Sequence, residues 1–100
     1  MENEIYFKEV EMKRQKARGG YYHEGIILAD GLEIKFSVLT NQNFYTENGK
    51  PEFLIGRNYS DSKFTFRELN VEIGDLAKKR ELEDRVHRLF DQCYEEQSRQ

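Results

Sequence analysis

The chain has 100 residues and a formal net charge of −3 at pH 7, with 35% charged and 37% hydrophobic residues. This length fits a single domain, over 1–100, with a small core. The acidic balance disfavours general nucleic-acid binding, which depends on a basic surface that neutralises phosphates.

Cysteine usage and the N-terminal sequence bear on the compartment. The single cysteine, Cys93, excludes an internal disulfide and favours a reducing compartment. The first residues, MENEIYF, lack the basic start and apolar run of a signal peptide. No apolar stretch approaches the roughly 20 residues of a membrane span. We therefore expect a cytoplasmic protein that does not bind membranes.

Residues 2–13 predict a first strand, in which the apolar alternation changes phase near Lys8-Glu9 and indicates a β-bulge. The following segment, 13–20, has the sequence KRQKARGG. One interpretation of this segment is a solvated hairpin loop. The other is a mobile basic finger that contacts phosphate or an acidic partner. Its basic residues are Lys13, Arg14, Lys16 and Arg18.

The stretch 20–39 predicts the central hairpin of an antiparallel sheet. Asp30-Gly31 stands between two apolar runs, and a type I′ turn needs the positive φ that Gly accepts and Asp tolerates. In the second run apolar residues alternate with polar ones, which is typical of a strand with one buried face. Gly25 interrupts the first run and indicates a bulge or a close approach of another backbone.

A polar loop is expected over 40–51, which contains Asn48-Gly49 and the single proline. Two large aromatic residues, Phe44 and Tyr45, lie within it. Either one of them folds back to cover the core, or they form an exposed anchor of the kind enriched at hot spots of protein interfaces.

Residues 52–57 and 63–73 predict two further strands that pair as a second hairpin, joined by the turn-rich residues 58–62. A second change of phase indicates a bulge or bend near Glu68. Tyr59 lies in the turn and is a further candidate for protein binding.

The residues from about 75 to 97 predict an amphipathic helix with Asp75 as the N-cap. An apolar stripe at helical spacing is expected to lie on the sheet, and it consists of Leu82, Val86, Leu89, Phe90 and Cys93. The predicted fold class is therefore α+β. An antiparallel sheet of about five strands, with two hairpins and long bent strands over about 3–73, carries one C-terminal amphipathic helix packed on it.

No constellation of residues predicts catalysis, so we expect a protein that is not an enzyme and uses no cofactor. His87 has Asp84 and Asp91 at helical spacing, but one His with two carboxylates lacks the ligand set of a zinc site, and we expect no metal. Cys93 lies in the apolar stripe, where a free cysteine packs as a small hydrophobe. The glycines build neither G-x-x-x-x-G-K nor G-x-G-x-x-G.

The order of these elements resembles that of the small bacterial regulators of the stage V sporulation protein G type. There, a strand similar to 52–57, a polar turn, a strand similar to 63–73 and a terminal helix follow one another. The family has a Met-Pro-Ser stretch after its strand, whereas Ile55, Gly56, Arg57 and Asn58 stand at the matching positions here, without proline. No functional residue is therefore carried over. The resemblance implies dimers and sequence-preferring nucleic-acid binding.

In length, charge and lack of catalytic motifs, the chain also resembles the class of small phage-encoded inhibitors that includes the anti-CRISPR proteins. This resemblance implies a protein of phage or mobile-element type that acts by binding.

Two functions fit these observations. The first is a non-enzymatic, acidic regulator or inhibitor that binds a nucleic-acid-handling protein complex, whose basic surfaces would attract it; its candidate residues are Phe44, Tyr45 and Tyr59. The alternative is a regulator that binds DNA or RNA through a local basic loop. Candidates for contact with nucleic acid or an acidic partner are Lys13, Arg14, Lys16, Arg18, Lys78, Lys79 and Arg80. A homodimer fits either function.

Overall fold

The computed structural model describes residues 5–16, 20–54 and 66–98 of the chain. These residues form six strands and one helix. The strands are β1 (Tyr6–Lys16), β2 (Gly20–Ala29), β3 (Leu32–Thr40), β4 (Phe44–Glu47), β5 (Lys50–Phe53) and β6 (Phe66–Val71), and the helix is α1 (Leu76–Ser98).

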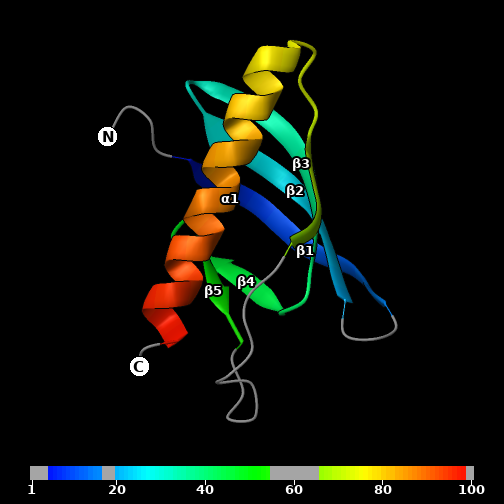
Figure 1. The fold of residues 1–100 in the computed structure, drawn as a ribbon, viewed down its shortest axis with the longest axis vertical. Coiled ribbons are helices and arrows are strands. Elements are labelled where there is room, and N and C mark those ends of the chain that lie inside the picture. The colour runs from blue at the N-terminus through cyan, green and yellow to red at the C-terminus, as the bar shows by residue number, and fades with distance from the viewer. Residues whose placement is uncertain (1–4, 17–19, 55–65, 99–100) are drawn as a thin grey trace.

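Four of the strands make one antiparallel sheet in the order β1-β2-β3-β6, and β4 and β5 make a separate two-stranded hairpin. Figure 1 shows α1 lying across one face of the four-stranded sheet, with the β4–β5 hairpin at the end of the molecule where α1 ends. The predicted α+β fold class, an antiparallel sheet with one C-terminal helix packed on it, is confirmed.

Both hairpin turns have the backbone that their sequences favour. Asp30 and Gly31 have φ values of 53° and 79°, and Asn48 and Gly49 have the same pair of values. Positive φ at both central residues is the signature of a type I′ turn. The first turn was expected to close the central hairpin, and the pairing of β2 with β3 confirms it.

Two strand pairings differ from those expected. The polar loop predicted over 40–51 contains β4 and the start of β5, which pair around Asn48-Gly49. A two-residue turn brings its flanking residues together locally, so β5 pairs with β4 and not with the strand that follows it. That strand, β6, pairs instead with β3 in the main sheet. The expected turn 58–62 and the adjoining 55–57 and 63–65 lie outside the described residues.

The predicted bulges are confirmed. The register of β1 against β2 shifts between Phe7 and Glu9, and the register of β3 against β6 shifts where Leu39 faces Glu68. A further shift between Met12 and Arg14 bends β1 again. Bulges of this kind also protect β1, which is an edge strand, from pairing with other chains.

Gly25 is required by the first bulge. A Cβ atom at this position would lie 1.9 Å from the carbonyl oxygen of Glu9 in β1, so the two backbones meet where no side chain fits. The close approach expected at Gly25 is therefore confirmed.

The basic segment 13–20 is mostly strand and not loop. β1 continues through Lys16, which faces Gly20 of β2, so that only residues 17–19 separate the two strands. Arg14 and Lys13 thus belong to a paired strand of the sheet, which differs from both the loop and the finger interpretations.

The helix begins and packs as its sequence predicts. The carboxylate of Asp75 accepts the backbone N–H of Lys78 at 3.1 Å, which is the geometry of an N-cap. The stripe residues Leu82, Val86 and Phe90 are fully buried, and Cys93 and Tyr94 complete the buried face of α1. On the sheet side, this face meets the apolar residues of the core, among them Phe7, Ile27, Phe36, Val38 and Val71.

Replacing Gly25 with Ala is expected to lower the free energy of unfolding by about 3 kcal/mol, because the added methyl group must displace the backbone of β1. Urea unfolding measures this change. Gly74→Ala is the matched control, since a Cβ there has nothing within 4 Å. Equal effects of the two substitutions would contradict the close approach.

Candidate functional site

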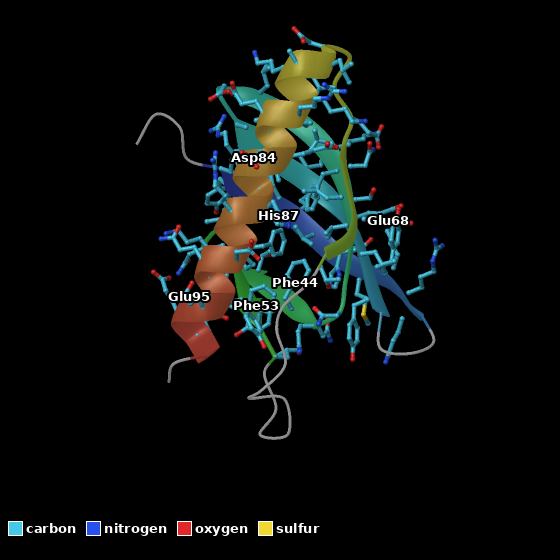
Figure 2. All side chains as sticks on the ribbon, viewed as in Figure 1. Phe44, Phe53, Glu68, Asp84, His87 and Glu95 are labelled. Carbon is cyan, nitrogen blue, oxygen red and sulfur yellow. The ribbon has the colours of Figure 1, made fainter. Side chains whose placement is uncertain are left out.

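The β4–β5 hairpin presents one face to the core and one to the outside. Phe44 and Phe53 are directly paired and both are buried, at 3% and 8% exposure. Figure 2 shows both residues beside the C-terminal part of α1. Of the two aromatic candidates, Phe44 therefore covers the core and is not available as an anchor, whereas Tyr45 is 49% exposed.

The outward face of the hairpin forms what we call the hairpin surface: Tyr45, Glu47, Lys50, Glu52 and Leu54. Tyr45 faces Glu52 across the two strands, and an N–H···O bond from Leu54 to Asn43 continues the ladder by one residue. Leu54 is thus a diagonal neighbour of Tyr45, and it is 53% exposed. Two large apolar side chains therefore lie next to one another, bordered by carboxylates.

The hairpin is tied to α1 by a side-chain clamp. The side-chain carbonyl of Gln97 accepts the N–H of Phe53 at 2.7 Å, and its amide donates to the carbonyl of Pro51 at 3.0 Å. At the turn, the N–H of Phe7 in β1 donates to the carbonyl of Gly49 at 2.9 Å. The backbone of the hairpin is therefore held by α1 on one side and by β1 on the other.

His23 makes the third connection, from β2. Its ring stacks on Phe44 with centroids 4.1 Å apart, and Nε2 lies 3.2 Å from the Phe44 carbonyl oxygen. Since a carbonyl only accepts, Nε2 carries the proton in the neutral ring. His23 is 1% exposed. Burial lowers its pKa below the usual value, and the carbonyls of Phe44 and Tyr21 offset part of this effect.

A groove of about 830 Å³ runs along α1 beside the start of β1 and the Asn48-Gly49 turn. The apolar residues at its surface include Ile5, Tyr6 and Leu89, and the ring of Tyr6 lies against Gly49. The cationic residues of the helix wall already have partners. Arg85 pairs with Asp30 at 3.2 Å, which ties the central hairpin to α1, and Arg88 pairs with Asp84 at 3.1 Å.

Cys93 lies at the inner side of this groove but is buried, at 6% exposure. Burial, and secondarily the carboxylate of Glu96, raises the pKa of its thiol above the usual value. A reactive cysteine needs the opposite, an electropositive site that favours the thiolate.

The basic candidates of the N-terminal strand lie apart from the hairpin surface. Lys13 forms an ion pair with Glu11, and the guanidinium of Arg14 lies 4.6 Å from the centroid of the Tyr22 ring. The side chain of Lys16 and all of Arg18 are outside the described part of the chain, as is Tyr59. Of the described basic candidates in this strand, Arg14 therefore lies against an aromatic ring, that of Tyr22, and Lys13 is paired with a carboxylate.

The second basic group lies at the opposite end of the molecule, in the first turns of α1 (Figure 1). Lys78 and Arg80 are exposed, and the ammonium of Lys79 donates to the side chain of Asn70 on β6 at 2.6 Å. These residues are too far along α1 to form one site with Lys13 and Arg14, which lie at the other end of the sheet.

His87 and its neighbours form a solvated face of α1. His87 lies 3.4 Å from Asp91, and Figure 2 shows His87, Asp84 and Glu95 along the helix. Within residues 5–16, 20–54 and 66–98, no group of three or more His, Cys, Asp or Glu side chains is arranged to hold a metal ion. No helix in these ranges has the length and apolar character that crossing a membrane requires.

Comparisons with protein-family models, with curated proteins and with solved structures find no match to this chain. The resemblance to the sporulation regulators and to the phage inhibitors therefore stays a prediction.

Of the hairpin surface, the sequence identifies only Tyr45 as a candidate, and it does not identify Glu47, Lys50, Glu52 or Leu54. The sequence pattern places Leu54 in a strand interior, and nothing in it marks His23 or Gln97 as contacts of the hairpin. The dipeptide Asn48-Gly49 could have predicted this second hairpin, because it favours the same turn type as Asp30-Gly31 and directly follows the segment that contains Tyr45.

Gln97→Ala is expected to lower the free energy of unfolding by about 1–2 kcal/mol, because a part-buried N–H and carbonyl of β5 lose their partners. Gln92→Ala is the matched control, since Gln92 is exposed on the same helix. Thermal or urea unfolding of both variants measures the difference. A Gln97 variant as stable as the Gln92 variant would show that the clamp contributes nothing.

Alkylation of Cys93 is expected to be slow at neutral pH and to accelerate with rising pH, because its raised pKa keeps the thiol protonated and the fold shields it. The rate of reaction with iodoacetamide in the native protein, compared with the rate in urea, measures this protection. Equal rates in the two conditions would contradict a buried, unreactive cysteine.

Proposed function

We propose that the protein is a non-enzymatic regulator or inhibitor that acts by binding another protein through the hairpin surface. The observation that carries the proposal is the pair Tyr45 and Leu54, both about half exposed, side by side on a paired hairpin. Tyr is enriched at binding hot spots, and it loses little conformational entropy on binding. An exposed apolar pair on an ordered support is the kind of anchor that such interfaces use.

The charges around this pair favour a basic partner. Glu47 and Glu52 belong to the hairpin surface, and Lys50 is its one basic residue. The Gln97 clamp holds the C-terminal end of α1 against the hairpin, and Glu96 lines the same groove as Lys50. A basic surface of a protein that handles nucleic acid would match this charge, and electrostatic attraction would raise the association rate.

The charges of α1 support a role beyond stability. Beyond the N-cap Asp75, its first turn contains no acidic residue, and its last turn contains Glu95 and Glu96 but no basic residue. A helix is stabilised by the reverse arrangement, because its macrodipole is positive at the N-terminus. Acidic residues at the C-terminal end therefore cost stability, which is consistent with their use toward a partner.

A nucleic-acid-binding regulator is the second candidate, and one contact favours it. Arg14 over the Tyr22 ring joins a cation to an aromatic plane, the combination on which single-stranded nucleic acids stack. The charges beside it oppose this function, since Lys13 is paired with Glu11 and the Tyr22 hydroxyl donates to Glu24. A basic surface that binds phosphate needs cations that are not neutralised in this way.

The test is affinity capture with the full chain from a cell lysate, with and without nuclease, followed by binding measurements on the captured protein after purification. Nuclease-resistant capture is expected. Tyr45→Ala/Leu54→Ala should weaken the purified interaction by about 30-fold or more, the loss typical of a hot spot of at least 2 kcal/mol.

Leu32→Ala/Leu76→Ala is the matched control, because these two leucines are 45% and 59% exposed and lie away from the hairpin surface. This control should bind as the wild type does. Capture that disappears with nuclease and falls steeply with salt would favour the nucleic-acid function instead. Unchanged binding by the Tyr45/Leu54 variant would overturn the proposed surface.

A further inference from the structure

The β4–β5 hairpin depends on a small number of attachments to the main sheet. Among the described strands, β4 and β5 pair only with each other, so no ladder of backbone bonds connects the hairpin to β1 or β2. Its link to β2 is His23, through one hydrogen bond and one stacked ring, and both involve Phe44. Phe44 immediately precedes Tyr45, so the residue that anchors β4 in the core also positions the exposed anchor of the hairpin surface.

The His23 ring is held in a neutral state by its surroundings. Nε2–H donates to the Phe44 carbonyl, which leaves Nδ1 as a buried acceptor with no hydrogen-bond partner in the described part of the chain. Its strand neighbours are Met12 on β1 and Val38 on β3, and neither carries charge. A proton on Nδ1 would therefore place a cation among apolar side chains and leave its new donor without a side-chain acceptor.

Among the residues that the structure describes, no charged group compensates for such a proton. On β2, the flanking Tyr22 and Glu24 point to the opposite face by strand alternation and bond to each other. On β1, the residues that flank Met12, Glu11 and Lys13, are exposed and paired with each other. The flanking residues of β3 do not titrate. Tyr45 follows Phe44 but lies on the outward face of β4, and Cys93 and Tyr94 of α1 belong to the same core cluster as Phe44.

Cys93 is neutral at mildly acidic pH, because burial raises the pKa of its thiol above the usual value. It therefore cannot act as a counter-ion for an imidazolium. The two backbone carbonyls of Phe44 and Tyr21 are the groups that favour the protonated ring, and burial outweighs them.

We propose that protonation of His23 releases the β4–β5 hairpin from the main sheet, so that the hairpin surface is formed at neutral pH and lost at mildly acidic pH. The regulatory role of this release rests on the proposed function, whereas the release itself is a property of the chain alone. Opening the hairpin exposes His23 while it leaves the β1-β2-β3-β6 ladders intact. It therefore requires less disruption than global unfolding does.

The direction of the effect follows from linkage. The open form takes up the proton near the ordinary histidine pKa of about 6.5, and the closed form takes it up only at lower pH. The closed form is therefore fully favoured above this pH. As the pH falls below this value, the ratio of the closed form to the open form decreases by up to about tenfold per pH unit, until the ring of the closed form is protonated as well.

The test uses His87→Gln, which leaves His23 as the only histidine in the chain. NMR gives the titration of its ring directly, and hydrogen exchange, corrected for the intrinsic rate at each pH, gives the protection of individual amides. Between pH 7 and pH 5.5, the amides of β4 and β5 are expected to lose about tenfold in protection. Amides that pair β2 with β3 should keep theirs.

His23→Gln is the second variant, since a side-chain amide can still donate to the Phe44 carbonyl but does not titrate. Its hairpin protection should be independent of pH over the same range. Equal loss in β2, β3 and the hairpin would mean global unfolding and would overturn the proposal, as would a hairpin that stays protected while His23 titrates.

These measurements need no partner, so they separate this proposal from the proposed function. If the hairpin opens as expected but the Tyr45/Leu54 variant binds normally, the proposed release of the hairpin is supported and the proposed binding surface is wrong. If the variant loses binding but the hairpin stays closed at pH 5.5, the proposed binding surface is supported and the proposed release is wrong.

Discussion

The packing of the Phe90 ring is the interaction on which the arrangement of the main sheet, the β4–β5 hairpin and α1 depends. It is fully buried, and its centroid lies 5.4 Å from that of Phe7 in β1 and 5.0 Å from that of Phe44 in β4. One side chain of α1 thus joins the main sheet and the separate hairpin. Edge-to-face contacts of this kind are worth about 0.5–1.5 kcal/mol each beyond the area that they bury. Without a ladder between the two sheets, this aromatic packing positions the hairpin.

The same packing explains why the hairpin can present an apolar surface. Phe44 and Phe53 pair with each other and fill the space beside Phe90, so the alternation of the strands turns Tyr45 outward. Burial of one face therefore specifies the register of the other face. Gln97 of α1 and the Phe7–Gly49 hydrogen bond then hold the hairpin backbone at its two sides, and His23 contacts it from β2.

Features that depend on neighbouring residues were predictable. The Asp30-Gly31 turn, the bulge at Glu9, the cap at Asp75 and the buried stripe of α1 all follow from local conformational preference or from periodicity within one element. The second hairpin was missed although Asn48-Gly49 is an equally strong turn signal. Its short flanking strands contain Thr, Glu, Lys and Pro and lack the apolar alternation that identifies longer strands.

For the candidate site, the chain by itself determined that Phe44 and Tyr45 stand together in a polar segment and that the surface is mixed in charge and mildly acidic. Only the tertiary structure decided which of the two aromatic rings is buried, because that choice depends on His23 and Phe90, which are distant in sequence. It also decided that Leu54 joins Tyr45 and that the basic residues near the N-terminus lie in a paired strand. Contacts between distant segments, and not local preference, separate the core face of this hairpin from its exposed face.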